Sequence, residues 1–350
     1  MGEHIDLDIP KEQSAEWHEL EKLVGSLVKE QKPARLHLIN EIFRVAVKLA
    51  KESPGTLNLK IVASCLKELK FSFKMFYPDR QIPKITIFGS ARTPADSPLY
   101  AFTKDFAKRA VQANYMIITG GGPGIMAAGN EGAGEKGFGL NIRLPFEQSA
   151  NPFISTEKRL INYKYFFTRK LFLVKEASAF AFFPGGFGTF DEAFEVLTLL
   201  QTGKSNLIPV TLMEPKGFGF WAAFVKFIET EVIPRGFISP QDLSLFRICN
   251  TADEAIAHFN HFYSCYHSMR FVKEKVVVRM KKKLSPKSLE ELSKQFAKLS
   301  LTGKFEQTGP LPEEGNEPEI KGLTRLVFPS ERKDFAMLRR LIDFLNDHSA

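Results

Sequence analysis

The segment with the clearest capacity for chemistry is Phe183–Glu192, which reads Phe-Pro-Gly-Gly-Phe-Gly-Thr-Phe-Asp-Glu. It follows a short apolar run and precedes a stretch with helical periodicity. Glycines let backbone amides approach a ligand closely, and free amides at the start of a helix favour a bound phosphate. Three glycines in four positions exceed what a tight turn requires, so we interpret the segment as a phosphate-binding loop. These glycines are Gly185, Gly186 and Gly188.

One hydroxylated and one acidic side chain of this segment have the spacing typical of a helix N-terminus. Thr189 is a typical N-cap residue, and Glu192 follows three residues later. This spacing predicts a capping box, with the helix beginning at Thr189. Glu192 would lie one turn beyond the loop, from where its carboxylate can point back at a sugar that carries the phosphate.

Two further glycine turns have a similar setting. Gly120–Ala127 follows an apolar run, and Gly122–Ala127 matches the dinucleotide-binding pattern G-x-G-x-x-A. That pattern normally follows the first strand of a sheet, whereas here it follows the second predicted strand. Gly89-Ser90 ends the first predicted strand. Small residues at three strand ends of one parallel sheet predict a single nucleotide-sized crevice.

The elements that must position these turns are short apolar strands alternating with helices from residue 84 onward. The predicted strands are 85–88, 115–119, 138–142, 179–183 and 207–212. The predicted helices are 99–112, 125–136, 164–178, 189–202 and 220–230. Continuous apolar strands, each followed by a helix, indicate a parallel sheet covered on both faces. The sequence therefore predicts an α/β fold with a Rossmann-like, doubly wound parallel sheet.

Two other regions flank this pattern. Residues 1–80 show apolar residues at helical spacing, with helices predicted at 16–29, 33–51 and 57–76. A helix is predicted at 252–268. The last 80 or so residues predict a small α+β appendage with strands at 272–280 and 323–329 and helices at 286–299 and 331–346. The expected domain boundaries are therefore 1–80, 81–270 and 271–350.

Composition narrows the class of protein. Of 350 residues, 44% are hydrophobic and 25% charged, which is typical of a globular chain and excludes a disordered or fibrous one. Three scattered cysteines favour a reducing cytoplasm over a disulfide framework. No apolar run approaches the ~20 residues of a membrane span. The net charge of +8 includes a basic stretch at Lys273–Lys287, but it lacks interleaved aromatics, which favours a solvated face over nucleic-acid binding.

One side-chain cluster outside the glycine loops could hold a metal ion. His258, His261 and Cys265 share one face of the predicted helix at 252–268. The neighbouring aromatic residues favour ordinary packing and surface instead. The sequence therefore predicts no metal site.

Arg169-Lys170 followed by Pro184–Glu192 resembles the LOG (LONELY GUY) family of phosphoribohydrolases. The signature of that family reads PGGxGTxxE, with an Arg-Lys pair upstream, and every fixed position is present here. Taken alone, Arg169-Lys170 would be a solvent-facing pair. The stretch Gly139–Gln148 is similar to the longer bacterial branch of the family, and the resemblance covers residues 84–270. The family is often labelled lysine decarboxylase, but no lysine stands out as the Schiff-base residue that pyridoxal phosphate needs.

The resemblance implies hydrolysis of the N-glycosidic bond in nucleoside 5′-monophosphates, such as AMP or cytokinin riboside 5′-monophosphate. It assigns catalysis to Arg169 and Glu192. It also implies a homo-oligomer and no metal or redox cofactor. The substrate-binding positions expected from the glycine loops and from the family match are Ser90, Gly121, Gly122, Gly124, Glu147, Lys170, Gly185, Gly186, Gly188, Thr189, Asp191 and Thr198.

Two alternatives remain open. A non-catalytic nucleotide-binding or molybdenum-cofactor carrier would share the fold and similar glycine loops, but it would not require both Arg169 and Glu192. An NAD(P)-dependent oxidoreductase would explain Gly122–Ala127, but the sequence shows no proton-relay group to accompany it.

Overall fold

The computed structural model describes residues 15–28, 33–52, 55–143, 149–154, 158–314 and 318–349. The chain divides into two compact units, Met1–Lys67 and Glu68–Ala350. The boundaries expected from the sequence stay predictions.

The first unit is helical, as expected from the spacing of its apolar residues. It contains α1 (Ala15–Val28), α2 (Pro33–Lys51) and most of α3 (Thr56–Phe76). Trp17 and Val24 are buried, and Arg44 of α2 forms an ion pair with Glu21 of α1.

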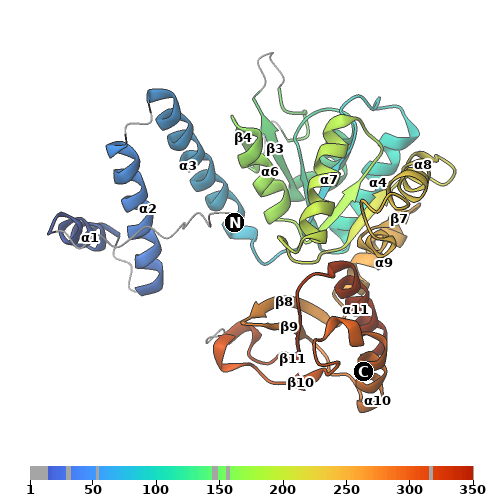
Figure 1. Cartoon of the computed structure of the whole chain (residues 1–350). Helices are drawn as coiled ribbons and strands as arrows, with labels where there is room; N and C mark the ends of the chain where they lie inside the picture. The colour runs from blue at the N-terminus through green and yellow to red at the C-terminus, as the bar shows by residue number, and fades with distance from the viewer. Residues whose placement is uncertain are drawn as a thin grey trace. The chain divides into compact units, whose positions relative to one another are not determined.

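The second unit is built on a seven-stranded sheet in which all neighbouring strands are parallel (Figure 1). The strand order is β4-β3-β2-β1-β5-β6-β7. The strands are β1 (Lys84–Phe88), β2 (Met116–Thr119), β3 (Gly137–Ile142), β4 (Leu160–Tyr163), β5 (Ala179–Phe182), β6 (Val210–Met213) and β7 (Arg247–Cys249). The predicted α/β fold is therefore confirmed. Prediction missed β4 and β7, the two edge strands, because each is short and only partly apolar.

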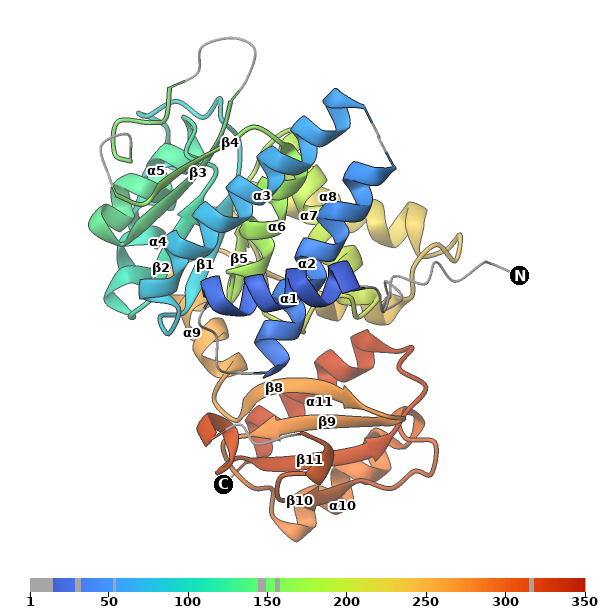
Figure 2. The same cartoon turned by 90° about the vertical axis from the view of Figure 1, so that its left-hand side faces the viewer.

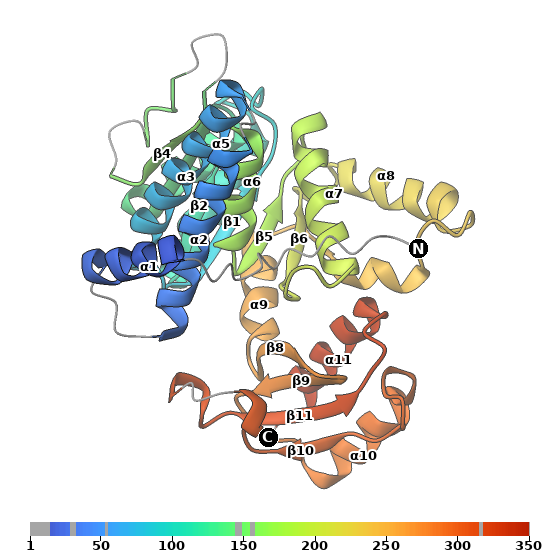
Figure 3. The same ribbon diagram turned by 60° about the vertical axis from the view of Figure 1, so that its left-hand side comes forward.

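Two layers of helices bury the sheet. Alternate residues of β1 separate into two core clusters, with Phe88 in one and Ile85 and Ile87 in the other. The first cluster receives side chains from α6 (Phe166–Lys175) and α7 (Phe187–Gln201), which lie on the same face (Figure 3). The second receives side chains from α4 (Pro98–Gln112) and α9 (Ala252–Phe262). Two further helices of the unit are α5 (Ile125–Ala133) and α8 (Phe220–Phe227).

The order of the strands fixes where a ligand can bind. The chain adds β2, β3 and β4 on one side of β1 and then crosses to the other side with β5. The direction of winding therefore reverses between β1 and β5. In an open parallel sheet, a ligand binds at the carboxyl ends of the strands at this reversal point. Gly89-Ser90 follows β1 and Pro184–Gly186 follows β5, so two of the glycine turns meet there.

The chain ends in a four-stranded antiparallel sheet with the order β10-β11-β9-β8 (Figure 2). Its strands are β8 (Tyr266–Val272), β9 (Lys275–Met280), β10 (Glu306–Thr308) and β11 (Thr324–Pro329), with helices α10 (Pro286–Gln295) and α11 (Phe335–His348). The strand predicted at 272–280 is confirmed over 275–280 as β9, whereas β8 was not predicted. A tight turn separates β8 from β9, and Lys273 has a φ of 51° there. Lysine carries none of the turn signal that Gly or Asn would provide. The predicted helix at 252–268 was too long, because α9 ends at Phe262 and the chain enters β8 at Tyr266.

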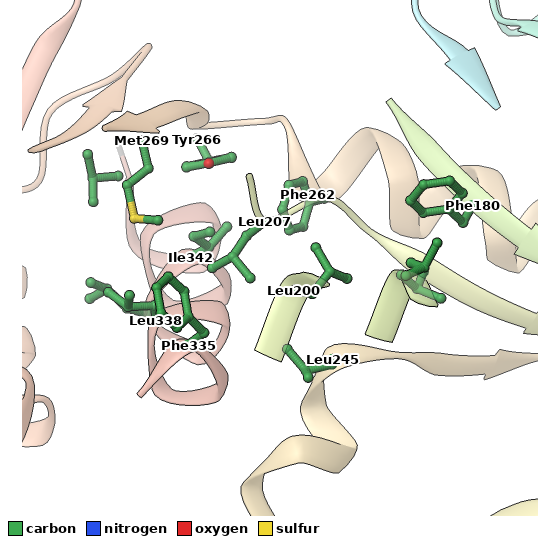
Figure 4. Packing of buried hydrophobic residues seen from close by; sticks show 14 of the residues in the cluster. Phe180, Leu200, Leu207, Leu245, Phe262, Tyr266, Met269, Phe335, Leu338 and Ile342 are labelled. Atoms are coloured by element: carbon green, nitrogen blue, oxygen red, sulfur yellow. The ribbon is translucent and has the colours of Figure 1, made fainter. Parts of the chain in front are cut away.

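The antiparallel sheet shares its core with the parallel one. A single cluster of buried side chains runs from β5 and α7 to β8, β9 and α11. Figure 4 shows Phe335, Leu338 and Ile342 of α11 on one side of this cluster. On the other side lie Leu200 of α7, Leu207 before β6 and Leu245 before β7. Gly203 has a φ of 68°, and its missing Cβ leaves the space that the Phe335 ring fills. The appendage is therefore packed onto the sheet that carries the glycine loops.

Candidate active site

A cavity of about 660 Å³ lies at the carboxyl ends of β1 and β5. The turn after β1 contributes Gly89 to Arg92 to its wall, and the end of β2 contributes Gly120. Helix α6 contributes Arg169, and the first turns of α7 contribute Gly186 to Glu192. Ligand pockets for drug-sized molecules measure about 300–1,000 Å³, so a mononucleotide fits this volume.

The helix α7 begins earlier than predicted. Its N-cap is Gly186, its first residue is Phe187, and no side chain caps it. The predicted capping box between Thr189 and Glu192 is therefore wrong. Residues 187 and 188 adopt helical geometry, so Thr189 lies inside the first turn and cannot act as its cap. As a result, the first amides of α7, which have no partner within the helix, border the cavity.

The physical reason for a glycine differs between the positions of this loop. A Cβ at Gly185 would lie 2.1 Å from Thr189 Oγ1 and 2.8 Å from Ser90 N, so packing within the protein excludes a side chain there. At Gly186 and Gly188 a Cβ would meet nothing within 4 Å. Both residues line the cavity, and neither has a positive φ. Neither the protein's packing nor its backbone demands glycine at these two positions, and both leave room for close approach of a ligand.

Arg169 is fixed by backbone carbonyls. Its Nε donates to Leu140 O at 2.6 Å and its Nη2 donates to Gly120 O at 3.2 Å. A Cβ at Gly120 would lie 2.2 Å from Nη2, so glycine is required there to admit the guanidinium. Two of its five N–H donors are thereby used, and Arg169 is one of the residues that line the cavity. Burial lowers the pKa of Arg169, and the nearby Glu192 opposes this change.

Glu192 is an unusual carboxyl group. Only 6% of the residue is exposed, and Oε2 has no hydrogen-bond partner among the described residues. Burial raises its pKa to about 7, against the opposing effects of Lys170 and Arg169. A buried carboxyl that has a shifted pKa and an oxygen without a hydrogen bond, and that lines a cavity, is a candidate for acid–base or charge-stabilising chemistry.

Lys170 lies beside Glu192 but does not line the cavity. Its Nζ lies 2.7 Å from Asp191 Oδ2 and 2.8 Å from Glu195 Oε2, and 3.9 Å from Glu192 Oε2. Sequence analysis did not single out Glu195. The signal was present as acidic residues at positions 191, 192 and 195, which share a face of one helix.

The other residues expected at the site either line the cavity, support its wall or lie elsewhere. Ser90, Thr189 and Asp191 line the cavity with Gly186 and Gly188, whereas Gly185 does not line it. The loop after β2, with Gly121, Gly122 and Gly124, supports the turn after β1 instead, since Ile125 N donates to Ser90 O at 3.0 Å.

Two residues lie elsewhere. Thr198 lines a separate apolar hollow of about 220 Å³ between α7 and α8. Glu147 lies outside the described residues.

The His258–Cys265 cluster has no metal-binding geometry. Within the described ranges, no group of three or more His, Cys, Asp or Glu side chains is arranged to hold a metal ion. Burial lowers the pKa of His258 to about 3, and His261 lies 3.0 Å from Asp347.

Among the residues that the structure describes, no helix is both long and apolar enough to cross a bilayer.

Comparison with known proteins agrees with the signature. Residues 122–259 match the family model described as "possible lysine decarboxylase". The chain is 32% identical over 98 residues to the cytokinin riboside 5′-monophosphate phosphoribohydrolase LOG3 of Arabidopsis thaliana, covering 28% of this chain and 44% of that protein. It is 28% identical over 154 residues to the probable enzyme LOG6 of the same plant, covering 43% of this chain and 74% of that protein. The chain thus spans less than half the length of the first curated relatives it matches.

Among solved structures, the molybdenum cofactor carrier protein of Chlamydomonas reinhardtii is 19% identical, with a TM-score of 0.35 over 51% of this chain and 95% of that one. Similarity at this level says nothing about function.

The decarboxylase description does not fit the cavity. Pyridoxal phosphate chemistry requires a lysine for a Schiff base, and no lysine is among the described residues that line it. The signature residues Arg169, Lys170 and Gly185–Glu192 all fall within the matched span. Over this span the chain is therefore similar to the LOG phosphoribohydrolases.

Proposed function

We propose that this protein hydrolyses the N-glycosidic bond of nucleoside 5′-monophosphates, AMP or a cytokinin riboside 5′-monophosphate. The products would be the free base and ribose 5-phosphate. One observation carries the proposal: Glu192, Arg169 and the open glycines Gly186 and Gly188 line the same cavity. The phosphoribohydrolase relatives support the same reaction.

The start of α7 provides the phosphate site. The amides of Gly186, Phe187 and Gly188 precede the first hydrogen bonds of the helix, in which Thr189 N and Phe190 N donate to Gly186 O at 3.0 and 3.1 Å. Free amides and the positive end of the helix dipole both attract a phosphate. A 5′-phosphate bound there would place the ribose against the second turn, where Glu192 lies.

Glu192 provides the negative charge that the reaction needs. Cleavage of the bond to the base passes through an oxocarbenium-like ribosyl cation, as in glycoside hydrolysis. The ionised carboxylate would stabilise that cation and accept a proton from the attacking water. The pKa of about 7 keeps the group available in both protonation states near neutral pH, which suits a group that takes up and returns a proton.

Arg169 provides a fixed positive charge. Its guanidinium is held by two carbonyls, so its remaining N–H groups need little reordering to bind substrate. It would orient the nucleotide and stabilise the electrons that move onto the leaving base. It cannot donate a proton, because the pKa of arginine remains far above neutral in proteins.

The test is incubation of the purified protein with AMP, GMP and CMP, with chromatography for the free base. The proposal expects base release that is lost in Glu192→Gln and in Arg169→Met, and retained in Glu229→Gln, which changes an exposed carboxylate on another helix. Nucleotide binding without base release would favour the carrier interpretation instead. Release at the wild-type rate by Glu192→Gln would exclude the assigned role.

A further inference from the structure

The ammonium of Lys170 is shared unevenly among three carboxylates of α7. It contacts Asp191 and Glu195 at 2.7 and 2.8 Å, but it lies 3.9 Å from Glu192, beyond hydrogen-bonding distance. Lys170 is the better buried end of these pairs, with 17% of its side chain exposed, against 61% for Asp191 and 33% for Glu195. The nearest cation to Oε2 of Glu192 is thus held away from it, and that atom has no hydrogen-bond partner in the described part of the chain.

We infer that Glu195 is a positioning residue: it anchors the Lys170 ammonium outside hydrogen-bonding reach of Glu192 and so limits how far that cation neutralises the catalytic carboxylate. The inference rests on the proposed function only in calling Glu192 catalytic. The distances from Lys170 to Asp191, Glu192 and Glu195 do not depend on which reaction the protein carries out.

The spacing along α7 explains how this works. Residues 191 and 195 are four apart on the helix, so their carboxylates lie on one face, and Lys170 of α6 reaches between them. Glu192 lies one position around the helix, with its carboxyl turned to the cavity. Two bonds to one side of the ammonium therefore fix its distance from the third carboxyl. If one of those bonds were removed, the ammonium could close the gap to Glu192.

The charges around Glu192 act in opposite directions. From α6, Lys170 and Arg169 favour the ionised carboxylate, and from α7, Asp191 and Glu195 oppose it. Glu195 thus acts on Glu192 twice, because it repels the carboxylate directly and also holds the cation away. Its removal should favour ionisation by both routes, whereas removal of Lys170 should disfavour it.

The two substitutions should therefore move the titration of Glu192 in opposite directions. In Glu195→Gln the pKa should fall, and in Lys170→Met it should rise. At about 4 Å, a unit charge shifts a neighbouring pKa by about one unit in water and by about three units near a protein surface. The Lys170→Met shift should accordingly be about one to three pH units, and the Glu195→Gln shift at least about half a unit. Asp191→Asn should move in the direction of Glu195→Gln by a smaller amount, because Asp191 is the more exposed of the two.

The experiment is a 13C NMR titration of protein labelled at the glutamate side-chain carboxyl carbon, in which the Glu192 signal is identified by its absence in Glu192→Gln. The readout does not require turnover. Opposite shifts in Glu195→Gln and Lys170→Met, with none in Glu229→Gln, would support the inference even if no nucleotide were cleaved, an outcome that would reject only the proposed function. An unchanged Glu192 titration in Glu195→Gln, with both variants folded, would overturn it.

Activity, where present, gives an independent check. A positioning role predicts that the acid limb of kcat/KM against pH follows the NMR shift in each variant. If Lys170 instead contacts the substrate, Lys170→Met would raise KM and leave that limb in place.

Discussion

Replacing Glu192 with glutamine should make the protein more stable at pH 8 while removing its proposed activity. The carboxyl group is buried and has a pKa of about 7 in the folded protein, against 4.5 for an unperturbed glutamate. Between these values the folded protein holds a proton that the unfolded chain has released. Stability therefore falls as the pH rises through this range, because the folded state must then bury an ionised group. Glutamine has nearly the same shape and cannot ionise.

The magnitude follows from the two pKa values. Their difference, multiplied by 1.36 kcal/mol per pH unit, gives a penalty of about 3 kcal/mol once the pH exceeds 7. The attraction of Arg169 and Lys170 is already contained in this figure, because both oppose the rise in the pKa. The penalty is about 1 kcal/mol at pH 5 and nearly complete at pH 8, so the advantage of the variant should grow by about 2 to 3 kcal/mol between them.

Urea unfolding of the wild type and of Glu192→Gln at pH 5, 6, 7 and 8 measures this directly. Effects of all other ionisable groups largely cancel in the difference between the two proteins. Glu229→Gln is the matched control, since it removes an exposed carboxylate and should show no advantage that grows with pH. A constant difference across the four pH values would refute the reasoning, because it would mean that Glu192 ionises as easily in the folded state as in the unfolded one.

Four other substitutions have defined expected outcomes. Gly188→Ala should retain or slightly raise stability, since alanine favours a helix and no atom lies within 4 Å of the added Cβ. The same variant should bind AMP more weakly in calorimetry. Gly185→Ala should instead lower the melting temperature, because its Cβ would clash with Thr189 and Ser90. Glu314→Gln should lower the free energy of unfolding by about 3 to 5 kcal/mol, because it leaves the buried Arg325 without its carboxylate partner at 2.9 Å; an unchanged urea midpoint would contradict this. Phe335→Ala should cost about 3 to 5 kcal/mol by the same measurement, since its ring packs into the shared core.

The fold was predictable where the sequence carries a strong local signal. The central strands β1, β2 and β5 are continuous apolar runs, and glycine turns mark their ends, so both the sheet and the crevice could be anticipated. The edge strand β4 has an alternating and partly exposed pattern, Leu-Ile-Asn-Tyr, and the β8–β9 turn is formed by Lys-Glu instead of glycine. These elements are stabilised by their neighbours and not by their own composition.

The candidate site was predictable in its members but not in its geometry. The motif identifies Arg169 and Glu192, yet the start of α7 depends on Phe187 and Gly188 adopting helical geometry, which a capping rule does not foresee. The role of Gly120 follows only from the position of the Arg169 side chain. The contact between Lys170 and Glu195 joins two helices across 25 residues, and no local pattern encodes such a pairing.

The central claim is that Glu192 and Arg169 direct water onto the sugar of a nucleotide whose phosphate lies on α7. Reaction with AMP in 18O-labelled water, followed by mass spectrometry of both products, tests it most directly. The account predicts adenine without label and ribose 5-phosphate carrying one 18O atom, with neither product formed by Glu192→Gln. Intact AMP after prolonged incubation with folded protein, or label appearing in inorganic phosphate, would contradict it.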